Sequence, residues 1–213
     1  MNRPRLFLVT PPEFDASAMA AKLEQAFAGG DVACVLIYMP GASTKDLQAT
    51  AEILVPVIQD GGAAAIVYQD TQAAGRSGAD GVHVDSSLDD VKLAVESFQP
   101  DRIVGTGGTK LKHDAMEWAE TGVDYLFFGK LDLAEKEAAH DKTLSGASWW
   151  AELFETPCVA LAGNTIETLD EVASTGADFV ALKDAVWQSE DDISSVIAEA
   201  NRILDAHPFP EVD

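Results

Sequence analysis

Eight short apolar runs, each followed by a stretch of helical periodicity, constrain the fold of this chain more than any other feature. They span residues 5–10, 32–38, 64–68, 81–85, 102–106, 125–129, 158–163 and 179–183. The runs are continuous rather than alternating, and they are rich in Val, Ile, Leu and Phe. This pattern is typical of parallel strands that are covered on both faces.

The segments between the runs have the pattern of amphipathic helices. Residues 165–176 are an example, with Thr165 before the apolar face and Gly176 after it. Eight strands alternating with helices in 213 residues predict one α/β domain over residues 1–213, closed as a (β/α)8 TIM barrel. A doubly wound open sheet is the alternative, although it normally has about five or six strands. Residues 207–213 are predicted to form a loose tail.

One phrase occurs three times, each time as glycine, a spacer, aspartate and an apolar run. The copies are SGADGVHVD at residues 77–85, TGVDYLFFG at 121–129 and TGADFVALK at 175–183. The glycine suits the left-handed backbone that ends a helix, and the aspartate is expected to bond turn amides where the next strand begins. Because barrel chemistry lies at the opposite, carboxyl ends of the strands, the phrase is predicted to be scaffold.

The charge of the chain excludes several classes of partner. With 14 Lys and Arg against 36 Asp and Glu, the formal net charge is -22, which repels nucleic acids and anionic membranes. A small phosphorylated metabolite would have to be held by local amides and a few cations. Residues 1–10 lack the pattern of a secretion signal and no stretch has the apolar length of a membrane span, so we expect a cytoplasmic protein. The oligomeric state stays open, a homodimer included.

Candidate phosphate-binding residues follow three of the predicted strands. They are Gly107 and Thr109 after the fifth run, Gly163 and Asn164 after the seventh, and Lys183 and Asp184 after the eighth. TIM barrels commonly bind phosphate after strands 7 and 8, through backbone amides and a cation. Against this, Asp184 would place a carboxylate beside the anion. Ordinary turns at the two glycine positions are the alternative.

Two aspartates could share a magnesium ion. Asp70 and Asp85 follow adjacent predicted strands, and carboxylate oxygens with water are the ligands that Mg²⁺ prefers. The alternative is that both are acids at helix N-termini, where the helix dipole stabilises them. His83, inside the fourth run, is predicted to be a core or rim histidine with its hydrogen bonds satisfied.

The lysines after the sixth run are the candidate catalytic residues. Lys130 could form a Schiff base if desolvation lowered its pKa, while a solvated lysine is the alternative. Lys136 lies in the long connection over residues 130–146, which reads either as a lid over the barrel or as a solvated charged loop.

Five segments in order resemble the thiamine phosphate synthase and TenI family over nearly the whole chain. They are LFLVT, SGADGVHVD, TGVDYLFFG, PCVALAGNT and TGADFVALKDAVW. The resemblance implies a (β/α)8 barrel. Its synthase members join a pyrimidine diphosphate to a thiazole phosphate with Mg²⁺, and its TenI members aromatise the thiazole phosphate. The loop lysine of the family corresponds to Lys136 or Lys142.

The chain departs from this family at several functional positions. Tyr38 stands where the family has the arginine of a Gln-Leu-Arg motif that grips diphosphate, and Tyr68 and Gln69 replace an Asn-Asp pair. The resemblance therefore predicts a divergent synthase-like protein. Two alternatives stay open: a Schiff-base aldolase that uses Lys130, and a non-catalytic protein whose mouth, made more apolar by Tyr38 and Tyr68, binds a ligand or partner.

Overall fold

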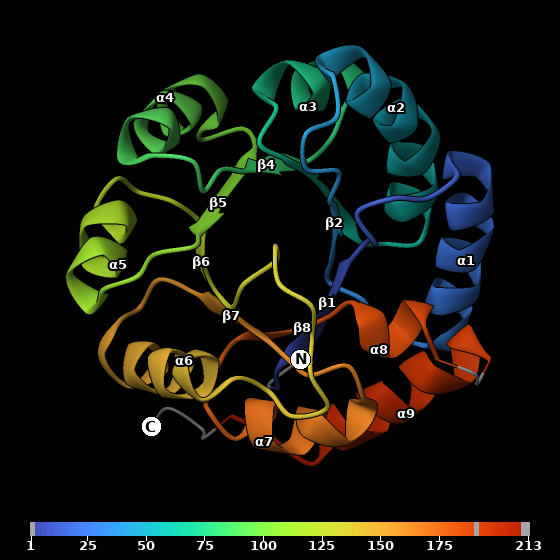
Figure 1. Cartoon of the computed structure of the whole chain (residues 1–213), viewed down its shortest axis with the longest axis vertical. Helices are drawn as coiled ribbons and strands as arrows, with labels where there is room; N and C mark the ends of the chain where they lie inside the picture. The colour runs from blue at the N-terminus through green and yellow to red at the C-terminus, as the bar shows by residue number, and fades with distance from the viewer. Residues whose placement is uncertain (1–2, 190–191, 210–213) are drawn as a thin grey trace.

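Eight parallel strands close into a barrel in sequence order, and helices surround them (Figure 1). The structure is a computed structural model that describes residues 3–189 and 192–209. The strands are β1 (Arg5–Val9), β2 (Cys34–Ile37), β3 (Ala64–Tyr68), β4 (Gly81–His83), β5 (Ile103–Gly107), β6 (Tyr125–Phe128), β7 (Cys158–Leu161) and β8 (Phe179–Leu182). Pairing of β1 with β8, in which Leu6 lies opposite Val180, closes the sheet. The predicted barrel is confirmed and the open sheet is excluded.

Each strand is followed by helical structure on the outside of the barrel. The helices are α1 (Ala16–Gly29), α2 (Thr44–Asp60), α3 (Thr71–Ser77), α4 (Leu88–Phe98), α5 (Lys112–Ala119), α6 (Asp141–Leu153), the 3-10 helix η1 (Ile166–Thr168), α7 (Leu169–Ala173), α8 (Asp184–Trp187) and α9 (Ile193–Asp205). Two expectations need correction. The helix expected after Thr165 is divided between η1 and α7, and the long connection after β6 ends at residue 140, because α6 begins at Asp141.

Large side chains fill the inside of the barrel. Phe7, Tyr125 and Phe127 pack edge to face there, with ring centroids 5.6 and 5.9 Å from Phe7. Gly105 on the neighbouring strand makes room for Tyr125, because a Cβ atom at residue 105 would lie 1.9 Å from Cζ of the tyrosine ring. Since the interior is packed, a ligand has to bind at the end of the barrel rather than within it.

The repeated phrase is scaffold at the amino ends of the strands, as predicted. Its glycines 78, 122 and 176 have φ angles of 75, 93 and 83°, the left-handed backbone that glycine adopts without steric penalty. The expected partner of the aspartates was wrong in detail. Asp80, Asp124 and Asp178 accept hydrogen bonds not from their own turns but from the backbone N–H groups of Ala65, Val104 and Cys158 on the preceding strands, at 2.7, 2.7 and 2.8 Å. The phrase therefore links adjacent strands of the barrel.

The predicted loose tail lies partly outside the described residues, which end at Phe209. His207, its first residue, contacts the rest of the chain, with Nε2 2.9 Å from Oδ1 of Asp170. In the described part of the chain, none of the helices combines the length and apolar character required to cross a membrane.

Candidate active site at the carboxyl ends of the strands

A cavity of about 220 Å³ opens at the carboxyl ends of β3 to β6. Its lining residues are Tyr68, His83, Asp85, Gly108, Phe127, Gly129, Lys130, Leu131 and Asp132. The structure thus brings together three candidate site residues, Tyr68, Asp85 and Lys130, and the predicted core histidine His83. From the glycine-rich turn after β5 it is Gly108 that lines the cavity, between the predicted Gly107 and Thr109.

Asp85 lines this cavity and accepts hydrogen bonds from two neighbouring side chains. Its Oδ1 atom accepts a bond of 3.0 Å from the Tyr68 hydroxyl and a second bond from Nε2 of Gln69. Gln69 has a φ angle of 65°, an uncommon conformation for a residue other than glycine. Burial and the neighbouring Asp85 carboxylate raise the pKa of Tyr68 to about 12, so this phenol stays protonated and donates to the aspartate at neutral pH.

His83 lies below Asp85 and is almost fully buried. Its Nδ1 atom is 3.0 Å from the Tyr125 hydroxyl and its Nε2 atom is 4.0 Å from Oδ2 of Asp85. Burial lowers the pKa of His83 to about 4, although Asp85 opposes this, and the imidazole is therefore neutral at pH 7. The predicted core position of His83 is confirmed, and one of its two ring nitrogens has a hydrogen bond.

The carboxylates differ in their fitness for a metal ion. Asp70 caps α3, because its Oδ1 atom accepts a bond of 2.8 Å from the Ala73 N–H, which is the alternative that the sequence left open. Asp132 instead lines the same cavity as Asp85. Within residues 3–189 and 192–209, no three His, Cys, Asp or Glu side chains form a metal-binding group. Mg²⁺ usually takes one or two protein carboxylates plus substrate oxygens, a requirement that Asp85 and Asp132 fit.

The connection between β6 and α6 extends over the middle of the strand ring, where it appears yellow in Figure 1. We call its residues 131–137 the strap. The strap lies on the ends of β7 and β8, since the N–H of Asn164 donates to the Lys136 carbonyl at 2.8 Å. Gly163 permits this approach, because a Cβ atom there would lie 2.3 Å from the Glu137 carbonyl oxygen. The long connection is therefore packed against the barrel rather than free in solvent.

Glu135 of the strap forms a buried ion pair with Lys183. Oε1 of Glu135 lies 3.4 Å from Nζ of Lys183, and the two side chains are 4% and 5% exposed. The other carboxylate oxygen accepts a bond of 3.1 Å from the Asp184 N–H. Burial raises the pKa of Glu135 to about 7, against the opposing charge of Lys183. Nζ of Lys183 also lies 3.4 and 3.5 Å from the carbonyl oxygens of Leu131 and Leu133.

The residues predicted to hold phosphate after β7 and β8 are thus neighbours in space, and the strap already contacts each of them: Gly163, Asn164, Lys183 and Asp184. Sequence reasoning missed Glu135. It is one acid among several in a charged stretch, and no local pattern marks it as buried, because its partner lies 48 positions further along the chain.

The remaining predicted residues lie around the cavity. Tyr38 is buried and packs edge to face on Tyr68, with ring centroids 4.7 Å apart. Gly107 ends β5, and Thr109 is half-buried in the turn that follows. The side chains of Lys130 and Lys136 are exposed.

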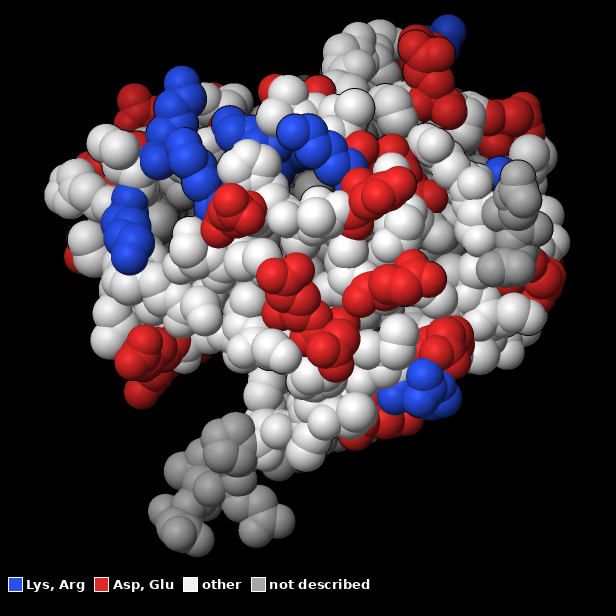
Figure 2. All heavy atoms as spheres, turned by 60° about the horizontal axis from the view of Figure 1, so that its bottom comes forward, with Lys and Arg blue, Asp and Glu red and all other residues white. Residues whose placement is uncertain are grey.

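Lysines are concentrated at one end of an acidic molecule, although acids lie among them. Six of the nine lysines belong to the connections or first helical residues after β5, β6 and β8: Lys110, Lys112, Lys130, Lys136, Lys142 and Lys183. Figure 2 shows Lys and Arg side chains gathered on one part of a face on which Asp and Glu are otherwise spread. The placement of the lysines favours an anionic ligand at the barrel mouth.

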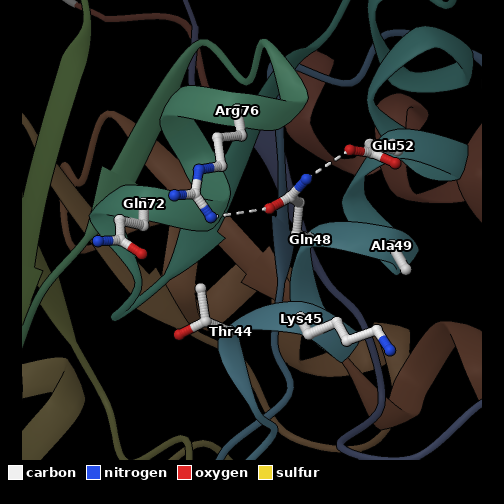
Figure 3. Close-up of a pocket in the computed structure, with 7 residues that line it drawn as sticks. All are labelled: Thr44, Lys45, Gln48, Ala49, Glu52, Gln72 and Arg76. Atoms are coloured by element: carbon white, nitrogen blue, oxygen red, sulfur yellow. Dashed lines mark hydrogen bonds between the residues drawn. The ribbon is translucent and has the colours of Figure 1, made fainter.

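A second hollow, of about 450 Å³, lies on the outside of the barrel between α2 and α3 (Figure 3). Gln48 of α2 links the two sides, because it accepts a bond of 3.4 Å from Nη1 of Arg76 on α3; within α2 it donates to Oε1 of Glu52 at 2.7 Å. It shares no lining residue with the mouth cavity.

Comparison with known proteins identifies the family and shows a similar fold. The family described as "Thiamine monophosphate synthase" matches residues 6–186. The chain is 36% identical to the thiamine-phosphate synthase of Rhodospirillum centenum over 201 residues, 94% of this chain and 97% of that protein. It is 32% identical to that of Hyphomonas neptunium, over 96% and 95% of the two chains. Its fold is similar to that of thiamine phosphate pyrophosphorylase from Pyrococcus furiosus, with a TM-score of 0.78 and 23% identity over 96% and 97% of the chains.

Proposed function

Because the chain belongs to the thiamine monophosphate synthase family, we propose that it joins a pyrimidine diphosphate to a thiazole phosphate at the mouth of the barrel. The observation that carries the proposal is the pairing of an anion site, Lys183 with the Asp184 N–H, with a separate cavity that contains Lys130 and two carboxylates. Two anionic substrates need two separate binding sites. The relatives are named thiamine-phosphate synthases, the two substrates are those that the family resemblance implies, and the family match extends over most of the barrel.

The thiazole phosphate would bind after β7 and β8. Lys183 supplies the cation, and the backbone N–H groups of Asn164 and Asp184 supply hydrogen-bond donors, once the strap no longer uses them. In a chain with a net charge of -22, these local groups have to provide the binding energy that long-range attraction does not.

The pyrimidine diphosphate would bind in the cavity at the ends of β3 to β6. Coupling releases the diphosphate, so positive charge has to stabilise the leaving group. Lys130 lines the cavity and contributes this charge, and Lys136 follows it closely in the sequence. Magnesium, where bound, adds charge at the diphosphate and would be held by Asp85 and Asp132. The Tyr68 hydroxyl and the side-chain amide of Gln69, which both donate to Oδ1, fix the orientation of Asp85.

Direct assay tests this proposal. Pure protein is incubated with the pyrimidine diphosphate, the thiazole phosphate and Mg²⁺, and product is followed by chromatography with a Lys183→Met variant as control. Formation of thiamine phosphate that depends on both substrates and on Lys183 supports the proposal. Absence of product at high protein concentration rules it out.

A non-catalytic ligand-binding protein is the second candidate. It is favoured by the strap contacts, which occupy the donors predicted to hold phosphate, and by the tyrosines at positions 38 and 68. A thermal shift with an unrelated apolar molecule but none with thiazole phosphate would support it. The Schiff-base aldolase has less support, because Lys130 is exposed and lacks the desolvation that such a lysine needs. Borohydride trapping with keto acids tests for an adduct at Lys130.

A further inference from the structure

The anion site after β7 and β8 contains an anion that belongs to the chain itself. Glu135 makes with Lys183 and the Asp184 N–H the two contacts that a bound phosphate would make, an ion pair and a backbone hydrogen bond. The side chains of both ion-pair partners are at most 5% exposed, so a second anion has no free access to Lys183 while Glu135 is in place. Two like charges cannot share one buried ammonium group without strong repulsion.

The strap around Glu135 has few other attachments. Asn164 donates to the Lys136 carbonyl, and Lys183 lies near the carbonyls of Leu131 and Leu133. Five of the seven strap residues are exposed; the other two are Leu131, which is buried, and Glu135, whose side chain is buried in the ion pair. The strap's hydrogen bonds to Asn164, Lys183 and Asp184 are therefore made to groups that would bind phosphate, and losing Glu135 from the site weakens the attachment of the strap.

From this geometry we propose that Glu135 is an internal competitor for the anion site, and that a phosphorylated ligand binds by displacing Glu135 and the strap from Lys183. The inference rests on the proposed function in one respect only, since it takes the Lys183 site as the place where the ligand phosphate binds. It adds a regulatory step, because the strap has to open before the site is complete.

The test measures binding of sulfate, a tetrahedral anion whose charge stays constant between pH 6 and 8. Glu135→Gln keeps the shape and the hydrogen-bond acceptor for Asp184 but removes the competing charge. Sulfate should bind Glu135→Gln at pH 8 at least about tenfold more tightly than wild type, as expected for one charge-assisted hydrogen bond. Glu137→Gln, an equal charge change at an exposed strap residue, is the matched control and should bind like wild type. Adding Lys183→Met to Glu135→Gln should abolish the gain.

A second measurement uses the wild-type protein, and it remains decisive if Glu135→Gln does not fold. The charged groups that act on Glu135 are Lys183 and Asp184, and its pKa is about 7. Lowering the pH from 8 to 6 neutralises the competitor, so sulfate affinity should rise about tenfold, in proportion to the protonated fraction. His140→Gln, which removes the imidazole at the end of the same connection, should show the same rise.

Each outcome decides the inference. It is overturned if Glu135→Gln binds sulfate no more tightly than wild type, if Glu137→Gln gains as much, if neither wild type nor Glu135→Gln binds sulfate, or if wild-type affinity does not change with pH. The outcomes also separate the inference from the proposed function. Coupling activity without an effect of Glu135 on sulfate overturns the inference alone, whereas Glu135-dependent sulfate binding without coupling activity overturns the synthase proposal alone.

Discussion

The imidazole of His83 and the hydroxyl of Tyr125 form a buried hydrogen bond of 3.0 Å inside the barrel. The bond joins β4 to β6 across β5, and it exists because Gly105 on β5 leaves space for the tyrosine ring. His83, Gly105 and Tyr125, on three adjacent strands, thus form a buried polar contact next to Asp85.

Acid should destabilise the protein through His83. The pKa of His83 is lowered from 6.5 in the unfolded chain to about 4 by burial, so the unfolded state binds the proton more readily. Its contribution to stability is complete above pH 6.5 and is lost as the pH falls towards 4, by up to about 3 kcal/mol. Urea unfolding between pH 4 and 7 should therefore show a smaller acid loss in His83→Gln than in wild type.

His83→Gln has to be compared with wild type, because Glu135 changes the free energy of unfolding with pH in the opposite direction between pH 4.5 and 7. Its pKa is raised from 4.5 to about 7, so its contribution falls as the pH rises through that interval. This term is common to wild type and His83→Gln and cancels in their difference. His113→Gln, at an exposed position, should follow wild type. An unchanged acid loss in His83→Gln would show that another group is responsible.

The aspartate of the repeated phrase should matter for stability and not for ligand binding. Oδ2 of Asp124 accepts from the Val104 N–H at 2.7 Å and from Nε2 of Gln99 at 3.0 Å. Asp124→Ala leaves a partly buried strand amide without its acceptor and should lower the free energy of unfolding by about 1 to 3 kcal/mol. Urea denaturation checks this, with exposed Asp101→Ala at the same end of the barrel as control. Equal losses in the two variants would count against a specific role for Asp124.

The sequence could predict the barrel and the place of the site because both follow from short-range patterns. A continuous apolar run such as residues 64–68 predicts a buried strand by itself, and the residues that follow such runs then lie at one end of the barrel. The contacts of Glu135 and Asp132 follow no such pattern, since they depend on the path of a connection without regular structure. Gly163 and Lys183, which are distant in the sequence, determine that path, and no local sequence pattern predicts such contacts.

Two Gly→Ala changes should have opposite effects. At Gly163 a Cβ atom would lie 2.3 Å from the Glu137 carbonyl oxygen and 2.8 Å from that of Lys136, so the strap has to move and the free energy of unfolding should fall by about 1 to 3 kcal/mol. At Gly75, inside α3, the nearest atom is 3.6 Å away, and alanine should stabilise the helix by about 0.5 to 1 kcal/mol. Urea denaturation at pH 7 measures both. Stabilisation by Gly163→Ala would mean that the strap does not rest on β7.

Removal of individual carboxylates should identify the magnesium ligands of the proposed synthase. Asp85 and Asp132 line one cavity, whereas Asp70 uses its carboxylate to cap α3. In the coupling assay, Asp85→Asn and Asp132→Asn should each raise the Mg²⁺ concentration required for half-maximal rate by at least about tenfold, since even indirect partners of a metal have effects of that order. Asp70→Asn is the matched control, because asparagine caps a helix as well as aspartate does, and it should leave the requirement unchanged. If Asp70→Asn shifts the Mg²⁺ requirement while Asp132→Asn does not, the metal binds to the pair of aspartates after β3 and β4 instead.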